Sequence, residues 1–306
     1  MISFQVVKDI GICRELWQKY SPNLYLSQIW DYRLCFHQGY QSQPNFIVAY
    51  ENSNPVGFIP LEFYPANNVY QIFGGGDWNE KLDLYLGQKI SDEDLLQMIK
   101  LIPVNQKIIF LSVDSKFIKP FEPTYYIDTG QVPDFEIFLL NMDKKHRKNL
   151  RLEIKKIEQS KINIKFGETN IIDDIVKFNQ ERFGKESSFS SLGFDTTFKL
   201  LLSQESLKGN IKTISIYIND KLEAAAICAL CKNTFTYLQG GSNFNINNLG
   251  KYLNYQVIKM AYDLKPAVID LLSDDCGWKT HWRSTVGMTY QLDTPKNVNI
   301  IHVCGH

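Results

Sequence analysis

The sequence predicts an α+β fold that is built from two similar units, each with a mixed central sheet flanked by helices. Strand-like and helix-like segments follow one another in the same order twice along the chain, which indicates internal repetition. Of the 306 residues, 44% are hydrophobic and 22% are charged, as in a packed globular protein. We therefore expect two domains, over residues 1–133 and 134–306, with the boundary at Gly130–Pro133.

The first half of the chain contains the patterns of one such unit. Runs of β-branched and aromatic residues predict strands, and apolar residues at helical spacing predict helices. Ser91 can cap a helix whose first turn holds Glu93 and Asp94. The expected elements are strands at Met1–Val7, Phe46–Tyr50, Val56–Phe63, Val69–Phe73, Lys107–Val113 and Thr124–Ile127, with helices at Cys13–Tyr20, Gln28–Gln38 and from Ser91.

The second half repeats this order. Asp143 can cap a helix that runs from Lys144 to Gln159. The later elements are helices at Asp173–Phe183, Thr196–Leu202 and from Gly250, with strands at Ile211–Ile218, Ala224–Cys231, Thr234–Leu238 and Val268–Leu272. In this alignment the glycine turn Gly74–Gly76 of the first half corresponds to Gly240-Gly241 of the second.

The stretch from Thr234 to Trp282 holds the features that point to a ligand. Gly240 and Gly241 end its first strand, and the loop Ser242–Asn248, with four asparagines, leads into a helix with one apolar face. The free N–H groups of a first helical turn, together with the helix dipole, attract a phosphate or a carboxylate. The turn therefore predicts an anion site, and the alternative is a connection that binds nothing.

A dense polar segment follows the last strand of this stretch. Asp274, Asp275 and Lys279 lie just past Val268–Leu272, and open α/β sheets bind ligands at the carboxyl ends of their strands. Adjacent carboxylates raise each other's pKa, so either aspartate is a candidate base. Lys279 can neutralise a phosphate or a developing oxyanion; the alternative is an acidic turn with a solvated lysine. Cys276 is a weaker candidate nucleophile, because the sequence fixes no histidine beside it.

Four features of this stretch resemble the C-terminal half of a GNAT acyltransferase domain of the CelD/FemAB-like branch. They are Tyr237 in a strand, Gly250 before a helix, Asp270 in the next strand, and the pair Trp278-Lys279. The upstream basic segment Lys144–Arg151 resembles the helix start of the same branch, so that the similarity covers residues 138–284. It implies two tandem GNAT-like domains and an N-acyltransferase that moves an acyl group from acyl-CoA to an amine, with acetyl-CoA as the favoured donor.

The resemblance also implies which residues would bind the two substrates. For the acyl-CoA cosubstrate these are Asn248, Leu249, Gly250, Lys251, Tyr252, Lys148 and Arg151. For the acceptor they are Asp77, Trp78, Tyr237, Gly241 and Trp278. Asp274, Asp275 and Lys279 would carry the catalysis. We expect the acceptor to be a small molecule or a cell-envelope precursor.

Two other functions stay open. A FemAB-type enzyme would take an aminoacyl group from a charged tRNA and transfer it to a cell-wall precursor. A non-catalytic ligand-binding module is favoured by the turn Asn245–Gly250, which lacks the full Arg/Gln-x-x-Gly-x-Gly/Ala pattern of ordinary GNAT enzymes. The basic run from Lys144 to Lys156 could bind the donor's phosphates or RNA, but a solvated outer face is the simpler interpretation.

Composition excludes several other classes. Lys+Arg and Asp+Glu are balanced at 33 each, so no global charge draws the chain to DNA. The lone Cys228-x-x-Cys231 lacks the second pair typical of a zinc site, so we expect no metal. The first residues lack a signal-peptide pattern, and no apolar run reaches the ~20 residues that cross a bilayer. We therefore expect a cytoplasmic protein without an integral membrane segment.

Overall fold

The computed structural model describes residues 2–75, 85–86, 90–102, 106–107, 109–110, 118–274 and 277–292. The chain forms two compact units. Unit 1 comprises the described residues within Met1–Glu122, Leu192–Leu201 and Met288–Cys304, and unit 2 those within Pro123–Ser191 and Leu202–Gly287. The predicted division into domains 1–133 and 134–306 stays a prediction.

Unit 1 contains two four-stranded sheets, with the strand orders β1-β3-β4-β7 and β2-β5-β6-β8. Its strands are β1 (Ile2–Val7), β2 (Gln43–Pro44), β3 (Phe46–Glu51), β4 (Asn54–Ile59), β5 (Leu61–Tyr64), β6 (Val69–Ile72), β7 (Tyr85–Leu86), β8 (Gln106–Lys107) and β9 (Ile109–Phe110). Its helices before residue 122 are α1 (Ile10–Tyr20), α2 (Trp30–Gly39) and α3 (Asp92–Lys100). Pro60 separates β4 from β5 where one strand was predicted, because proline cannot donate to a strand ladder.

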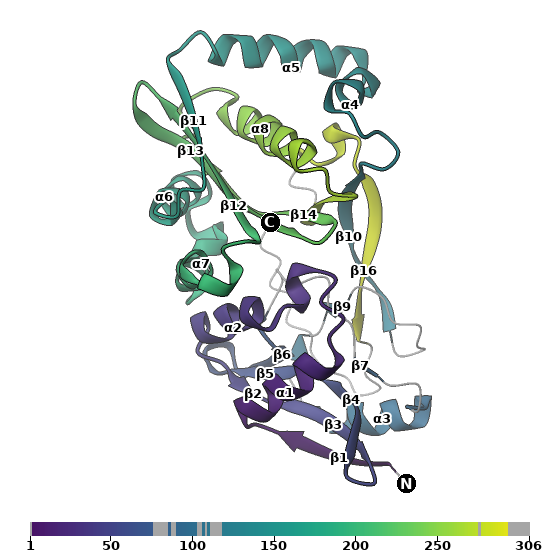
Figure 1. The fold of residues 1–306 in the computed structure, drawn as a ribbon. Coiled ribbons are helices and arrows are strands. Elements are labelled where there is room, and N and C mark those ends of the chain that lie inside the picture. The colour runs from purple at the N-terminus through teal and green to yellow at the C-terminus, as the bar shows by residue number, and fades with distance from the viewer. Residues whose placement is uncertain are drawn as a thin grey trace. The chain divides into compact units, whose positions relative to one another are not determined.

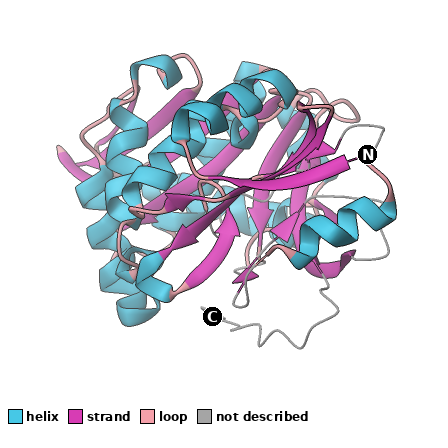
Figure 2. Cartoon of the chain, turned by 90° about the horizontal axis from the view of Figure 1, so that it is seen from below, coloured by secondary structure: helices cyan, strands magenta, loops and turns pink. Residues whose placement is uncertain are grey.

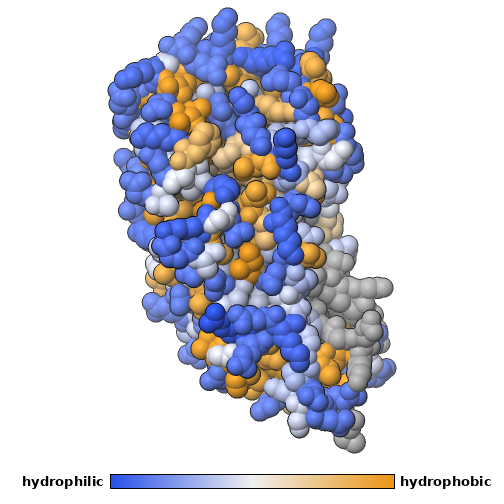
Figure 3. All heavy atoms as spheres, in the orientation of Figure 1, coloured by the Kyte–Doolittle hydropathy of each residue, from blue (hydrophilic) through white to orange (hydrophobic). Residues whose placement is uncertain are grey.

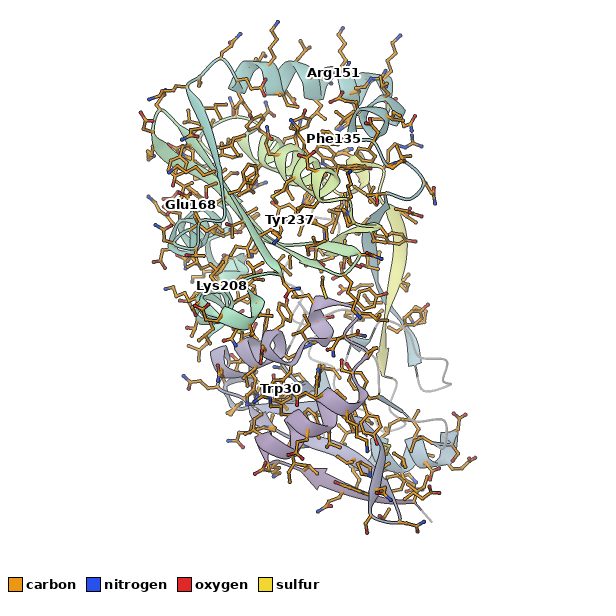
Figure 4. The ribbon with its side chains drawn as sticks, in the orientation of Figure 1. Trp30, Phe135, Arg151, Glu168, Lys208 and Tyr237 are labelled. Atoms are coloured by element: carbon orange, nitrogen blue, oxygen red, sulfur yellow. The ribbon has the colours of Figure 1, made fainter. Side chains whose placement is uncertain are left out.

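Aromatic packing holds the core of unit 1 together. Trp17, Phe46 and Phe73 are fully buried, and Trp30 stacks on Phe73 with ring centroids 4.8 Å apart (Figure 4). The indole nitrogen of Trp17 donates to the carbonyl of Gln28 at 2.7 Å, so this large side chain is buried without losing a hydrogen bond.

A buried polar network supports the turn that follows β6. The Glu62 carboxylate is fully buried and bonds His37 Nδ1 at 2.7 Å and Gln71 Nε2 at 2.9 Å. The Gln71 amide lies against Gly75, and Gly74 and Gly75 adopt φ values of 67° and 34°, where a side chain would be strained. The described part of the glycine turn predicted at Gly74–Gly76 is therefore confirmed.

Unit 2 is organised around a mixed sheet. The sheet has the strand order β11-β12-β13-β14-β15-β10-β16-β9, and the boundary between the two units passes within β10 and β16. The strands are β10 (Ile118–Asp128), β11 (Ile162–Phe166), β12 (Ile211–Ile218), β13 (Lys221–Cys231), β14 (Thr234–Ser242), β15 (Val268–Ser273) and β16 (Thr285–Leu292). The helices are α4 (Phe135–Asn141), α5 (Lys144–Ile157), α6 (Ile172–Phe183) and α8 (Leu249–Leu264). The helix α7 (Phe194–Ser203) belongs to unit 1 up to Leu201, and its last two residues belong to unit 2.

Helices cover both faces of the sheet in unit 2. α6 packs on one face of β13 and β14, and α8 packs on the other (Figures 1 and 2). α5 and α4 lie beyond α8, with Leu150 and Ile154 of α5 buried in the shared core. Within the described ranges, no helix is both long enough and apolar enough to cross a lipid bilayer.

Both units contain a short parallel strand pair that is joined through a helix. β6 pairs with β8 at Tyr70–Gln106 and Gln71–Lys107, and β14 pairs with β15 from Thr234–Val268 to Thr236–Asp270. The helices between the paired strands are α3 and α8. The predicted α+β fold with a repeated element order is confirmed.

Several local expectations are corrected. The helix expected from Gln28 begins at Trp30, because Leu26–Gln28 forms a 3-10 turn first. The sequence did not predict α4 or β11. The Phe135 ring of α4 packs on Tyr255 and Tyr262 of α8, and this contact between distant segments cannot be predicted from a local sequence pattern. Gly240 and Gly241 do not end a strand, since β14 continues through them to Ser242.

Gly241 is required because α6 approaches the strand closely at this point. A Cβ there would lie 2.9 Å from Asn179 Nδ2 and 3.0 Å from the carbonyl oxygen of Ile175. Substitution by alanine therefore has to push α6 off the sheet. Its predicted role in acceptor binding stays untested, but the packing already explains the glycine.

We expect Gly241→Ala to lower the free energy of unfolding by about 1–3 kcal/mol, the usual cost of overpacking. The matched control is Gly209→Ala, because a Cβ at Gly209 meets nothing within 4 Å. Urea denaturation measures both variants. Equal midpoints for Gly241→Ala and Gly209→Ala would contradict this account of the α6 contact.

Candidate functional site

The central feature of unit 2 is that β14 and β15 separate after a short parallel pairing. Their last paired residues are Thr236 and Asp270, although β14 runs on to Ser242 and β15 to Ser273. β14 also contains an extra residue, Leu238, because Cys228 of β13 pairs with Tyr237 and Ile227 pairs with Gln239. A bulge of this kind bends a strand and ends its pairing on one side. Beyond Thr236, no strand of the described residues pairs with this edge of β14.

Gly240 lies on β14 beyond its pairing with β15, and its backbone groups could bind a ligand. Its N–H donates to the Gln239 side-chain oxygen at 2.9 Å, and its carbonyl accepts from Asn179 Nδ2 at 3.0 Å. Both backbone groups are therefore bonded by side chains. An extended ligand that carries amides can replace the Gln239 side chain and pair with the strand.

The end of β15 is held in an unusual conformation. Leu272 and Asp274 adopt left-handed φ values of 64° and 61°, which cost roughly 1–2 kcal/mol each for residues other than glycine. The buried Asp270 carboxylate accepts from the Leu272 N–H at 3.1 Å. Lys279 Nζ donates to the carbonyls of Leu272, at 3.3 Å, and Ser273. These bonds turn the chain at the end of β15.

Lys279 is therefore tied to the backbone of the splayed strand. It is 5% exposed, and its ammonium lies 5.6 Å from the centre of the Tyr125 ring, a cation–π contact. Its burial rules out the solvated lysine that was the alternative from the sequence. Asp274 is described, whereas Asp275 and Cys276 lie outside the described residues, as do Asp77 and Trp78 of the acceptor prediction.

Tyr237 and Trp278, both predicted to bind the acceptor, are brought together beside the separated strands. Their ring centroids are 5.9 Å apart, and the Tyr237 hydroxyl donates to Asn254 Oδ1 at 3.2 Å. Figure 4 labels Tyr237. Burial raises the pKa of Tyr237, so its phenol stays protonated and acts as a donor. A Cβ on Gly240 would collide with this hydroxyl. The interior of the site is thus aromatic, with one fixed polar group.

The first turn of α8 has the features expected of an anion site. Asn248 precedes it with a φ of 65° and makes no side-chain cap, and the first turn has no acidic residue. The Leu249 N–H donates to the carbonyl of Ile246, and the Tyr252 N–H donates to the carbonyl of Asn248. Among the described residues, the N–H groups of Gly250 and Lys251 have no hydrogen-bond acceptor. Two backbone donors at the positive end of the helix dipole therefore remain for a ligand.

A cation from a distant segment lies beside this turn. Arg182, in the last turn of α6, has Nη1 3.8 Å from the position of a Cβ on Gly250, and Ser242 Oγ lies 3.1 Å from the same position. The Arg182 guanidinium lies 4.9 Å from the centre of the Phe183 ring. Within the described ranges, Arg182 makes no ion pair. Sequence reasoning missed Arg182 because no local pattern connects α6 with the start of α8.

Lys251 and Tyr252, predicted to bind the donor, use their side chains to hold α5 on α8. Lys251 Nζ lies 2.6 Å from Glu153 Oε2, and the Tyr252 hydroxyl donates to Glu158 Oε1 at 3.4 Å. Burial raises the pKa of Tyr252 to about 12. What the turn offers a ligand is therefore its backbone.

Lys148 and Arg151 lie on the exposed side of α5, while Glu153 on another side of the helix contacts α8. The exposed guanidinium of Arg151 lies 4.0 Å from the exposed Glu136 carboxylate. The structure does not bring these two cations to the α8 turn. Their predicted role in donor binding stays a prediction with no contact to support it.

A histidine pair lies near the same end of α8. His146 and His281 stack with ring centroids 5.3 Å apart, and His146 Nε2 is buried without a partner among the described residues. Burial, and then the charges of His281 and Lys251, lower the pKa of His146. The described residues bring together no group of three His, Cys, Asp or Glu that could hold a metal ion.

Comparison with known proteins agrees with this geometry. Residues 144–280 match the family model for an acetyltransferase (GNAT) domain. No curated protein sequence matches the chain.

Three solved structures are similar over nearly the whole chain. FemX is 11% identical, with a TM-score of 0.57 over 94% of this chain and 97% of its own. A tandem GNAT protein from the clavulanic acid biosynthesis pathway is 6% identical, with a TM-score of 0.55 over 97% and 100%. L-PGS from Bacillus licheniformis is 9% identical, with a TM-score of 0.55 over 95% and 94%.

At these identities the solved structures establish the fold. The chain has the fold of a tandem GNAT protein, and within it residues 144–280 are similar to an acetyltransferase (GNAT) domain. The predicted resemblance to a GNAT domain is confirmed for residues 144–280 by the family model, and the fold of the whole chain is similar to that of FemX. The chain therefore has an acyltransferase-like architecture.

The histidine pair provides a test of the packing around α8. Because the pKa of folded His146 is lowered, the unfolded chain binds the proton more tightly, and stability is lost as pH falls below about 6.5. His146→Phe keeps a ring against His281 and removes the titration. We expect the urea midpoint to fall less in His146→Phe than in the wild type between pH 7.5 and 5.5. An equal or larger fall in the variant would refute this role of His146.

Proposed function

We propose that the chain is an N-acyltransferase that uses an acyl-CoA donor, with acetyl-CoA as the favoured one. The observation that carries the proposal is the separation of β14 and β15 beside an uncapped α8 turn. An acyl-CoA is a long ligand with amides in its middle and phosphates at one end. The edge of β14 at Gly240 is suited to the amides. The N–H groups of Gly250 and Lys251, which have no acceptor among the described residues, are suited to the phosphates.

Each part of the donor then has a proposed contact. The pyrophosphate accepts from the two N–H groups and from Arg182, which is a suitable phosphate ligand because its guanidinium donates in a fork. The amides of the pantetheine arm displace Gln239 from Gly240. The thioester reaches the level of Tyr237 and Trp278, where the strands separate. Asn248, Leu249 and Tyr252 shape the turn.

The reaction is an acyl transfer from sulfur to nitrogen. The neutral amine attacks the thioester carbonyl, a C–N bond forms, the C–S bond breaks, and the thiolate leaves and takes up a proton. A carboxylate removes the extra proton from the amine, and we assign this role to Asp274 or Asp275. The acceptor is a small molecule or a cell-envelope precursor. Tyr237 and Trp278 are proposed to bind it, with Asp77, Trp78 and Gly241 as further predicted contacts.

Lys279 has two possible effects on this reaction. Its charge can stabilise the oxyanion, as predicted from the sequence. Its bonds to the Leu272 and Ser273 carbonyls can fix the end of β15 beside the thioester. Both effects would be lost in a Lys279→Ala variant.

We expect Lys279→Ala to lower single-turnover transfer by about 10²-fold, the scale of losing one oxyanion donor. Asp275→Asn should lower turnover and change the acid limb of its pH profile. Both rates are normalised to the folded fraction measured by circular dichroism. Wild-type rates in both variants would remove these residues from the mechanism.

Two alternative functions can be distinguished from this proposal by the donor that the protein binds. The similarity of the fold to FemX supports the alternative of a FemAB-type enzyme with an aminoacyl-tRNA donor. The incomplete glycine pattern of the turn supports the alternative of a ligand-binding module without catalysis. Thermal shift with acetyl-CoA, longer acyl-CoAs and charged tRNA distinguishes them, because a ligand stabilises only the state that binds it. Stabilisation by charged tRNA alone would replace our proposal. Stabilisation by acyl-CoA without transfer to any amine would favour the module.

The contribution of Arg182 can be measured directly. Arg182→Ala should weaken CoA binding by roughly tenfold, since a hydrogen bond to a charged group contributes about 1.5–3 kcal/mol before solvent screening. The control is Lys177→Ala on the same helix, which removes one exposed cation that is paired with Glu181. Isothermal calorimetry with CoA gives both affinities. If the two variants bind CoA equally well, Arg182 does not hold the phosphates.

A further inference from the structure

We infer that the exposed face of α5 binds an anionic lipid bilayer. This basic face is defined by side chains that are all exposed: Lys144, Lys145, Lys148, Arg151, Leu152, Lys155 and Lys156. It carries six cations and no carboxylate, although the whole chain has balanced charges of 33 and 33. In Figures 3 and 4, α5 lies along the upper edge of the view with hydrophilic side chains projecting from it.

The spacing of these cations is unfavourable for an isolated helix. Lys144 and Lys148, like Arg151 and Lys155, are four residues apart, and like charges at this spacing destabilise a helix. Other helices of the chain place an acid at the same spacing, as in Lys177–Glu181 and Lys199–Asp195. α5 therefore concentrates positive charge where other helices neutralise it, which indicates an anionic partner.

The acids of the α5 segment do not neutralise the basic face. Asp143 caps the helix and accepts from the N–H groups of Lys145 and His146, both at 2.9 Å. Glu153 pairs with Lys251 of α8 at 2.6 Å. Only Glu136 of α4 approaches a cation of this face among the described pairs, at 4.0 Å from Arg151. Among the described residues, the other five cations of the face therefore form no ion pair.

Packing holds the face in place. Leu150, Ile154 and Ile157 on the inner side of α5 are buried in the core of unit 2. A preformed helix meets a surface without the entropy cost of folding on it. The basic face is therefore a fixed feature of the unit.

Exposed apolar side chains favour a bilayer over a nucleic acid. Leu152 stands among the cations with 49% exposure, and Ile137 and Leu140 of the adjoining α4 are 52% and 54% exposed. At a bilayer surface, lysine side chains reach the headgroup phosphates while apolar ones enter the acyl boundary. Single-stranded RNA is usually held by exposed aromatic rings on which bases stack, and the basic face has none. This inference does not rest on the identity of the acyl donor.

Vesicle co-sedimentation tests the inference with the full chain. The probes are vesicles of phosphatidylcholine with about one third phosphatidylglycerol and vesicles of phosphatidylcholine alone, at physiological salt. The wild type should bind only the anionic vesicles. Lys148→Glu/Lys155→Glu should bind them at least tenfold more weakly, since each cation near an anionic surface contributes roughly fivefold.

The control variant is Lys185→Glu/Lys208→Glu, which changes the net charge equally at exposed positions away from α5. It should bind as the wild type does. Leu152→Asn should also weaken binding while leaving the charge unchanged. Equal loss in both charge-reversal variants, or no binding of the wild type to anionic vesicles, would overturn the inference. Binding of tRNA that depends on the basic face, without binding to vesicles, would assign the face to RNA instead.

Discussion

The site of this protein depends on one constraint, which is that β14 and β15 pair as parallel neighbours for three residues and then part. The extra residue at Leu238 ends the pairing on the side of β14, and the left-handed turn at Leu272 ends it on the side of β15. Asp270 and Lys279 supply the bonds that compensate the backbone of that turn. The separated strands therefore result from paired, buried groups and not from missing ones.

α8 connects this feature with the rest of unit 2. Two N–H groups of its first turn have no acceptor within the described part of the chain. The side chains of Lys251 and Tyr252 in that same turn bind Glu153 and Glu158. The backbone of one helix end thus faces a possible ligand, and its side chains fix a second helix. α5 in turn faces outward with a cationic surface. One helix contact therefore links the proposed donor site to the proposed bilayer surface in a single packed unit.

Many helices and strands could be predicted because local sequence patterns determine them. The apolar spacing of α8 and the Asp143 cap of α5 each depend on nearby residues. The site was harder, because it depends on contacts between distant segments. Arg182 reaches the α8 turn from α6, and Gly241 is a glycine because Asn179 packs against it. Lys279 was predicted as a solvated or catalytic cation, and only tertiary structure shows its carbonyl partners. Residues such as Asp77 and Asp275 lie outside the described residues.

The most direct test of the account is amide hydrogen exchange on the chain with and without CoA. If the donor lies between the separated strands, CoA should slow exchange at Gly240, Gly250 and Lys251, whose N–H groups the proposal assigns to the ligand. Amides of β12, which are already paired on both sides, serve as the internal reference. Binding of CoA with protection elsewhere, and none at these three amides, would contradict the central claim.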